Sequence, residues 1–449
     1  MPDPFRIQEH LDPCLGIYAQ PSEPGTLQPM FFKVLHNMTM IGDMLHVRPG
    51  RRKINGALFG DGTRTMWGMA TWRGSPDKFI VASGTLLQSM PAGGGDPTAL
   101  TTNYPSGSWT RAGARTTMVQ LGNQIFIVNG TDPNIKYNGT NLTRMGLVAP
   151  ASLSAPTKSA GALNGTFSYK ATLISSTTNS SQESEPTAAL AVSYADQQGT
   201  FSSPTVPSSD PQIDRWFLYR IAAGGSTYFR VNTTAVTLAT TIADNLTDDV
   251  LIVSRAIDTS GNNAVPPGKF TALAPHQGRL AGVIATDANT LYWSDLGLDT
   301  GGIYFKPEAW PAVNRLPFGD QGGTLITALV SFYDWLIVFQ DFGVWSIQGD
   351  LNSVDNRTIA PVLVGPDKRG AGVSEIGNIA VAENHVYFTA KDGVYHLLKD
   401  STFTSRVRVE KVSNHIEALY QKINFSAGGT ALYDRDGRRY ILWGKGLVS

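Results

Sequence analysis

The chain has 449 residues, with 36 Lys and Arg against 36 Asp and Glu, so its formal net charge at pH 7 is zero. Charged residues make up 16% of the chain and aromatic residues 10%, whereas globular domains typically carry about 25% charged residues. This composition excludes a protein that binds nucleic acid through a strongly basic body, and it excludes a disordered chain.

The start of the chain, MPDPFRIQEH, lacks the basic and apolar regions of a secretory signal, so none is expected. No run of 18 apolar residues occurs, so no transmembrane helix is expected. The single cysteine, Cys14, cannot form an internal disulfide and leaves the cellular compartment open.

Short apolar runs bounded by Gly, Asn or Asp predict β-strands along most of the chain. The first two predicted hairpins cover residues 70–87 and 118–128. Each consists of an apolar run, a polar turn and a second apolar run. We therefore expect an all-β fold.

Residues 151–262 predict a separate β-domain between two boundaries. A Pro, Ala and Ser linker precedes it at 149–156, and Pro266 and Pro267 follow it. Strand-like runs separated by polar spacers lie at 165–176, 189–194, 215–222, 227–232 and 240–246. The size and pattern favour an inserted immunoglobulin-like or fibronectin-like β-sandwich.

Three further hairpins follow at residues 273–293, 329–347 and 379–398, and a last one at 431–443. The segments 329–347 and 379–398 align without a gap over their first eleven residues, and each places an aromatic residue after a Gly-Val pair. The Asp-Gly pair in KDGVY (391–395) is typical of a type I′ hairpin turn. The best helix candidate is 413–422, where Ser413 stands at the N-cap position.

The spacing of the hairpins indicates a repeat. The residues that open each second strand are Lys78, Gln124, Arg279, Trp335, His385 and Arg439. The intervals are 46, 155, 56, 50 and 54 residues, and the long interval exceeds the others by about the length of the inserted domain. Four-stranded propeller blades repeat every ~40–50 residues. The sequence therefore predicts an irregular β-propeller of about five or six blades. Its body comprises residues 1–150 and 263–449, interrupted by the insert at 151–262.

The motifs of common enzymes are absent from the sequence. The seven histidines are His10, His36, His46, His276, His385, His396 and His415, and none has the spacing of a zinc site. His385 and His396 lie within strand patterns and are expected to be half-buried strand residues. The sequence contains no G-x-S-x-G nucleophile elbow and no phosphate-binding P-loop. We expect no catalytic site, no metal and no cofactor.

One basic loop stands out against the neutral background. Arg48, Arg51, Arg52 and Lys53 surround a Pro-Gly turn in VRPGRRKING. Two interpretations stay open: a solvated turn, or a loop tip that contacts phosphate or a protein partner.

The blade patterns resemble those of a known family. Residues 276–297 (HQGRLAGVIATDANTLYWSDLG), 326–349 and 372–397 are similar to the blade signatures of bacteriophage tail proteins. The closest resemblance is to the tail nozzle, or tail tubular protein B (hub), family of short-tailed phages. The inserted segment, with ESEP (183–186) followed by RWFLYR (215–220), is similar to modules found in such virion proteins.

The resemblance implies a structural virion protein that forms a homohexameric ring. Such a ring lies beneath the tail adaptor, extends the channel for genomic DNA ejection and docks tail fibres or spikes. It would act in the phage tail after assembly in the host cytoplasm, without inserting into a membrane and without catalytic activity. The basic loop of Arg48, Arg51, Arg52 and Lys53 would then face the channel or a partner. The alternative is a propeller-based module that binds a receptor or glycan, and a propeller hydrolase is a third possibility.

Overall fold

The computed structural model describes most of the chain between residues 66 and 414 and several short segments outside that range. The described residues are 66–100, 115–175, 182–206, 210–257, 263–296, 308–318, 325–340, 343–351, 384–390, 392–399 and 407–414, with the short segments 16–17, 31–32, 38–41, 44–47, 298–299, 302–303, 358–361, 379–382, 429–434 and 439–444.

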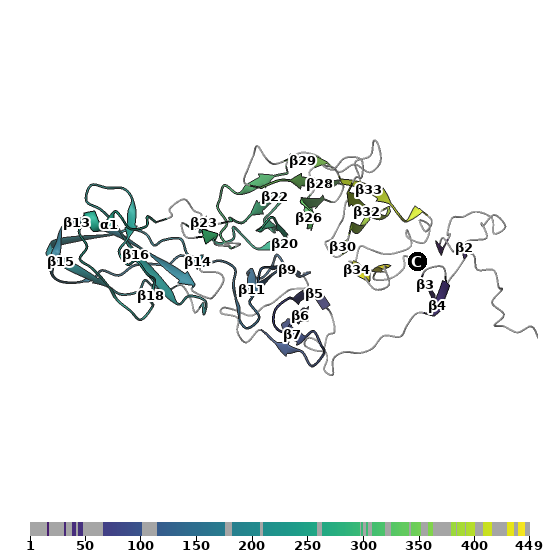
Figure 1. Cartoon of the computed structure of the whole chain (residues 1–449), viewed down its shortest axis with the longest axis horizontal. Helices are drawn as coiled ribbons and strands as arrows, with labels where there is room; N and C mark the ends of the chain where they lie inside the picture. Colours follow the sequence, from purple (N-terminus) through teal and green to yellow (C-terminus); the bar gives the residue numbers. More distant parts are fainter. Residues whose placement is uncertain are drawn as a thin grey trace, which may run out of the picture. The chain divides into compact units, whose positions relative to one another are not determined.

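The described residues form five four-stranded antiparallel sheets in which each strand pairs with the next strand of the same sheet along the chain (Figure 1). Chain-order meanders of four strands are the blades of β-propellers. The sheets are, in order, β5 (Met66–Trp72), β6 (Lys78–Ser83), β7 (Leu86–Pro91) and β8 (Thr98–Ala99); β9 (Thr117–Leu121), β10 (Gln124–Val128), β11 (Ile135–Tyr137) and β12 (Leu142–Arg144); β20 (Phe270–His276), β21 (Arg279–Ile284), β22 (Asp287–Trp293) and β25 (Arg315–Pro317); β26 (Ile326–Phe332), β27 (Trp335–Gln340), β28 (Gly343–Gln348) and β29 (Thr358–Pro361); and β30 (Ile379–Ala382), β31 (His385–Ala390), β32 (Gly393–Lys399) and β33 (Val407–Lys411).

Shorter sheets complete the described strands. They are the parallel pair β1 (Gly16–Ile17) and β2 (Phe31–Phe32), and the antiparallel pairs β3 (Met38–Ile41) and β4 (Met44–Val47), β23 (Leu298–Asp299) and β24 (Gly302–Ile303), and β34 (Gly429–Asp434) and β35 (Arg439–Gly444).

The predicted repeat is confirmed residue by residue. The six residues expected to open the second strands are the first residues of β6, β10, β21, β27, β31 and β35. The chain is therefore all-β, and its repeated four-stranded sheets give it the β-propeller architecture. The match arises because each hairpin has a well-marked polar turn between two apolar runs.

The first strands of three sheets share a local irregularity. The ladder slips by one residue near Trp67 in β5, Thr271 in β20 and Thr327 in β26. At the two threonines the hydroxyl donates to the carbonyl of the partner strand, at Val283 and Phe339, over 3.2 Å in both cases. A bulge adds twist and bends the strand, so we expect the first strand of each of these three sheets to bend at the same place.

The β9–β12 sheet buries both faces against its neighbours. In β10, Ile125 and Ile127 join a core with the β5–β8 sheet, whereas Phe126 and Val128 join a core with the β20–β25 sheet. Alternate residues of a strand point to opposite faces. This arrangement explains the near-continuous apolar runs. A sheet with one solvent-exposed face would instead show alternating apolar and polar residues.

The chain divides into two compact units. One comprises residues 54–323 and 350–355 and holds the first three blade sheets and the inserted segment. The other comprises residues 1–53, 324–349 and 356–449 and holds the β26–β29 and β30–β33 sheets, which share an apolar core that includes Phe339 and Phe388. The predicted domain boundaries at 150 and 262 stay a prediction, because the insert belongs to the same compact unit as the sheets that flank it.

The inserted segment forms the strands that were predicted, but their hydrogen bonding differs from a two-sheet sandwich. Seven strands are linked in one antiparallel sheet, which we call the module sheet (Figure 1). Its main order is β17-β16-β13-β15-β19, with β14 paired to β13 and β18 to β16. The strands are β13 (Thr157–Ser175), β14 (Gln182–Glu183), β15 (Leu190–Phe201), β16 (Arg215–Ile221), β17 (Tyr228–Arg230), β18 (Val236–Thr237) and β19 (Ile242–Asp244).

The module sheet curls until strands far apart in its order share one core. Leu218 of β16 and Ile242 of β19 belong to the same apolar cluster, although β13 and β15 lie between their strands in the ladder. The 19-residue β13 makes this possible, because its first part pairs with β15 and its last part with β16. The immunoglobulin-like or fibronectin-like assignment stays a prediction.

Helix is scarce in the described residues. The one α-helix there, α1 (Asp248–Leu251), was not predicted and spans a single turn after β19. Of the helix predicted over 413–422, residues 415–422 lie outside the described residues, and Ser413 and Asn414 are not α-helical.

Candidate functional site: a buried polar junction

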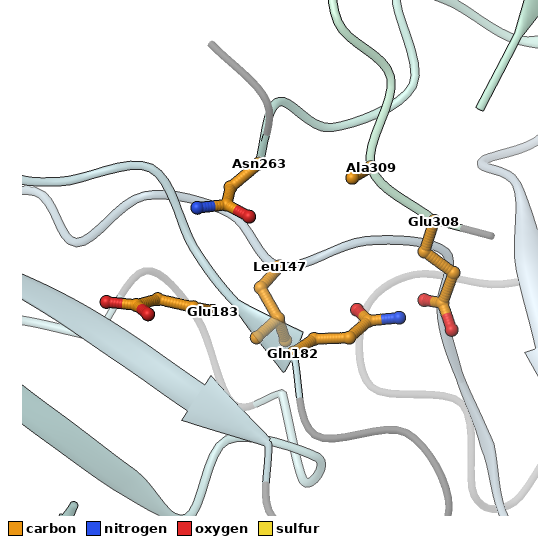
Figure 2. Close-up of a pocket in the computed structure, with 6 residues that line it drawn as sticks. All are labelled: Leu147, Gln182, Glu183, Asn263, Glu308 and Ala309. Atoms are coloured by element: carbon orange, nitrogen blue, oxygen red, sulfur yellow. The ribbon is translucent and has the colours of Figure 1, made fainter. Parts of the chain in front are cut away.

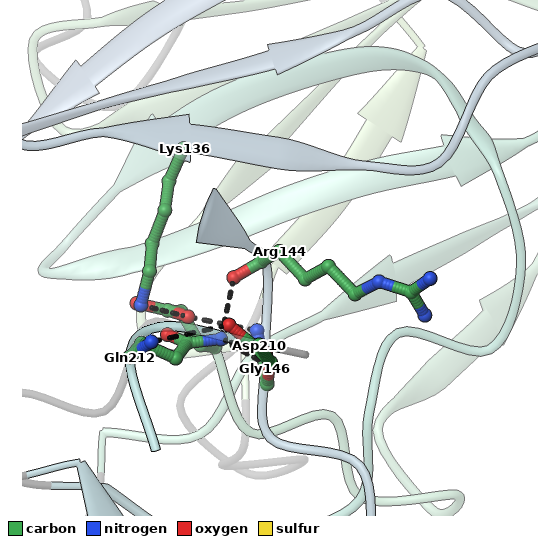
Figure 3. A network of polar contacts seen from close by, with 6 residues as sticks. Lys136, Arg144, Gly146, Asp210 and Gln212 are labelled. Carbon is green, nitrogen blue, oxygen red and sulfur yellow. Dashed lines mark hydrogen bonds and ion pairs between the residues drawn. The ribbon is translucent and has the colours of Figure 1, made fainter. Parts of the chain in front are cut away.

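The residues of the predicted basic loop, Arg48, Arg51, Arg52 and Lys53, lie outside the described residues. Within the described residues, a buried polar arrangement lies where the inserted module joins the blades. We call Lys136, Gly146, Gln212 and Glu308 the junction cluster (Figure 3).

An ion pair forms the centre of the junction cluster. Lys136 lies on β11, and its Nζ donates to both carboxylate oxygens of Glu308 over 2.6 and 2.7 Å. The exposed fractions of the two side chains are 5% and 0%. Removing two charges from water is costly unless they are paired and hydrogen-bonded. The contact of Lys136 Nζ with both carboxylate oxygens of Glu308 meets that requirement.

The backbone after β12 connects this ion pair to the inserted module. The Gly146 N–H donates to Glu308 Oε2 over 2.7 Å. The Gln212 amide, from the module, donates to the carbonyls of Arg144 and Gly146 over 3.2 Å in each case (Figure 3). Asp210 Oδ2 accepts a third bond from the same amide nitrogen, over 2.7 Å, which fixes its orientation.

Gly146 is required by its backbone. Its φ is +80°, a backbone conformation that residues other than glycine rarely adopt. A Cβ there would approach Pro266 Cδ at 3.1 Å and the Glu308 carbonyl at 3.3 Å. The glycine therefore lets the chain leave the blade and pass close to Val265, Pro266 and Glu308.

The segment that returns from the module to the blades, at residues 263 and 264, is also held by hydrogen bonds. The Asn263 N–H donates to Glu185 Oε1 of the module over 2.9 Å, and Trp310 N–H donates to the Ala264 carbonyl over 2.8 Å. Both crossings of the chain between module and blade are thus fixed by hydrogen bonds. The module is attached to the blades through ordered contacts at each end.

A small pocket lies beside the junction. Leu147, Gln182, Glu183, Asn263, Glu308 and Ala309 line it (Figure 2). It has room for about one water molecule. Ligand sites for small molecules occupy roughly 300–1,000 Å³, so this pocket is a packing feature of the junction.

Two further polar clusters lie inside the module. Arg220 and Asp244 are both fully buried, with Arg220 Nε 3.2 Å from Asp244 Oδ2. The Tyr169 hydroxyl donates to the same carboxylate oxygen over 2.7 Å. Burial raises the pKa of Asp244 above its usual value, while Arg220 and Tyr169 counteract the shift. Burial, with Asp244 beside it, also raises the pKa of Tyr169.

In the second module cluster, Arg230 Nη2 donates to Glu183 Oε2 over 2.8 Å and its Nε donates to the Tyr219 hydroxyl over 2.9 Å. The Tyr219 hydroxyl in turn donates to Glu183. Burial is the main cause that raises the pKa of Tyr219. The guanidinium also packs 3.7 Å from the centre of the Phe217 ring. The charged atoms are directed at one another, so the arrangement joins β14, β16 and β17.

Sequence reasoning did not identify these clusters. Lys136 and Glu308 are 172 positions apart, and Arg220 and Asp244 lie on strands that do not pair in the ladder. A lysine or arginine inside an apolar run (NIKY, FLYRIA) is the signal that was available, since such residues are rarely buried without a partner.

Among the residues that the structure describes, no group of three or more His, Cys, Asp or Glu side chains could hold a metal ion. Within the same residues, no helix is long and apolar enough to cross a membrane. The prediction for His385 and His396 is confirmed, since both are half-buried residues of β31 and β32.

The fold and the junction define a β-propeller-type protein that carries an inserted β-module. No protein-family model matches the chain, and no curated protein matches it significantly. Solved structures similar to it include YCF48 from Cyanidioschyzon merolae, at 13% identity, 85% coverage of this chain, 93% of that chain and a TM-score of 0.32.

Two others are the Neurospora crassa Pan2 WD40 domain and apo AztD from Citrobacter koseri. The WD40 domain is 9% identical, with coverages of 84% and 88% and a TM-score of 0.28. AztD is 15% identical, with coverages of 77% and 85% and a TM-score of 0.26. Similarity this low transfers no function to the chain.

Proposed function

We propose that the chain is a structural virion protein of a short-tailed phage: a tail nozzle or ring component that extends the DNA-ejection channel below the adaptor and docks fibres or spikes. It acts through surfaces and without catalysis. The blade sequences at 276–297, 326–349 and 372–397 support this proposal through their resemblance to the nozzle family.

The junction cluster is the structural observation that carries the proposal. An assembly part must present its modules at fixed positions, because ring closure requires each interface to repeat with the same geometry. The Gln212 contacts hold the module to the chain that enters it, and the Asn263–Glu185 contact holds the end of the insert. A module fixed at both crossings suits a docking platform better than a mobile substrate lid.

The proposal is tested by the assembly state of the purified full-length chain. Mass photometry at several concentrations and electron microscopy of the same sample should give a hexameric ring with an open centre. Such a ring would be formed by head-to-tail contacts that close. A chain that stays monomeric at every concentration and binds sugars on a glycan array would overturn the proposal in favour of the receptor-binding alternative.

A further inference from the structure

Two histidines face each other on the β30–β33 sheet. His385 opens β31, and His396 lies on the neighbouring β32. Their imidazole rings are stacked, with centroids 5.2 Å apart and planes within 6° of parallel. We call these residues the histidine pair.

The two rings differ in their polar contacts. His396 Nε2 lies 3.0 Å from Glu410 Oε2 of β33, a contact that becomes a charged hydrogen bond when the ring is protonated. Within the described residues, His385 Nδ1 is buried and has no hydrogen-bond partner. A proton on His396 is therefore compensated by a carboxylate, whereas a proton on His385 is not.

Among the described residues, the other charged groups nearby do not provide that compensation. Glu410 is shared with Arg408 on the same strand, at 2.8 Å. Tyr387, from β31 itself, lies 5.8 Å from each histidine ring by centroid. The described part of β30 contributes Ile379, Ala380, Val381 and Ala382, none of which is titratable. Strand β34 packs against β30, and Ala431 is its one residue with a described side chain.

On their opposite face, β31 and β32 contribute to an apolar core. Val386 and Phe388 of β31 and Leu397 of β32 are fully buried in the core shared with the β26–β29 sheet. The histidine pair spans the ladder between these two strands on the other face. Separation of β31 from β32 at this point would expose that core to water.

We propose that the histidine pair is a proton-sensitive latch on the β30–β33 sheet: the strands stay paired while His385 is neutral, and a proton on His385 loosens them. The physical cause is the repulsion between two stacked cations that share one partly neutralised carboxylate.

The directions of the pKa shifts agree with this geometry. Burial lowers the pKa of His385, and His396 lowers it further. The hydrogen bond from His396 lowers the pKa of Glu410, which therefore stays ionised. A base with a lowered pKa in the folded state contributes stability at neutral pH that is lost as the pH falls below about 6.5, toward the folded-state value.

The first test follows the two rings directly. In the full-length chain with isotope-labelled histidine, NMR should show His385 titrating below the usual midpoint near 6.5. His396→Gln should move the His385 midpoint upward by roughly half a pH unit or more, because the neighbouring cation is removed. An unchanged His385 midpoint in His396→Gln would overturn the latch.

The second test follows the strands. After correction for intrinsic rates, hydrogen exchange in residues 379–399 should accelerate by about tenfold between pH 7.5 and 5.5. His385→Phe keeps a stacked ring without a titrating group and should lose this acceleration. Tyr387→Phe, which changes the neighbouring ring and leaves both histidines in place, should retain it. Equal acid responses in His385→Phe and the native chain would contradict the proposal.

Discussion

At the scale of single residues, the buried ion pair of the junction cluster sets a strict condition on the chain. Lys136 lies between Ile135 and Tyr137 on a strand whose three residues are all buried. Its ammonium is tolerated there only because Glu308 accepts from it with both oxygens. Buried pairs add little net stability, but losing one partner is severe because an uncompensated charge is left behind.

The junction pair gives a matched set of variants. Lys136→Met should destabilise the chain by roughly 3–5 kcal/mol, because the Glu308 carboxylate stays buried without its cation. Lys136→Met/Glu308→Gln should recover much of this loss, since the neutral amide still accepts from the Gly146 N–H. Chemical denaturation followed by fluorescence measures both. Equal losses in the single and double variants would show that the charge is not the cause.

At the scale of elements, strand positions could be predicted because they depend on local sequence. A polar turn between two apolar runs sets where β27 and β31 begin, and the prediction was correct at Trp335 and His385. The pairing of distant strands could not be predicted this way. The curl of the module sheet depends on which side chains meet across its core, such as Arg220 and Asp244, and no local pattern encodes that contact.

The Asp-Gly turn at 391–395 shows a further limit. Gly393 is the first residue of β32 and does not have the positive φ of the predicted type I′ turn. Its role is steric, because a Cβ there would lie 2.4 Å from Lys411 Cε and 2.5 Å from Ser413 Oγ. Ser413 Oγ accepts from the Val394 N–H over 2.9 Å. The glycine lets the chain after β33 approach closely, which a turn rule does not anticipate.

The curl of the module sheet should depend on Arg220. Arg220→Met removes the cation that lowers the pKa of Asp244, so burial raises that pKa further against only the hydrogen bonds from Tyr169 and the Leu246 N–H. We expect a loss of roughly 3–5 kcal/mol at pH 7. A carboxyl with a raised pKa in the folded state favours folding when protonated, so this loss should shrink as the pH falls from 7 toward 4.

The control for this prediction is Arg220→Met/Asp244→Asn, which removes both charges and keeps an acceptor for the Tyr169 hydroxyl. It should be more stable than Arg220→Met at pH 7, and the difference between the two should decrease on acidification. Thermal melting of both variants across this pH range provides the measurement. A pH-independent difference would exclude Asp244 as the source.

At the scale of the molecule, the module and the blades are coupled by few but specific contacts. Ala151 N–H donates to Thr205 O and Thr205 N–H donates to Ser152 O, so the entering chain is already part of the module. The Lys136–Glu308 pair and the Gly146–Glu308 bond, by contrast, lie entirely on the blade side. The ion pair should therefore form without the insert, while Gln212 and Asn263 provide the attachment.

Removal of the insert tests this division. Deleting residues 151–262 and joining the ends through a short Gly-Ser linker should leave the blade sheets folded, because the first three share cores formed by their own strands. The carbonyls of Arg144 and Gly146 would lose their bonds from Gln212, each worth about 1 kcal/mol, so a modest decrease in melting temperature is expected.

Gln212→Ala in the full chain is the matched control and should reproduce most of that decrease. Circular dichroism and thermal melting measure both variants, and loss of the β-sheet signal in the deletion variant would show that the insert is an integral part of the blade body. Retained sheet structure together with loss of the hexameric ring that we propose for the full-length chain would assign the insert to assembly.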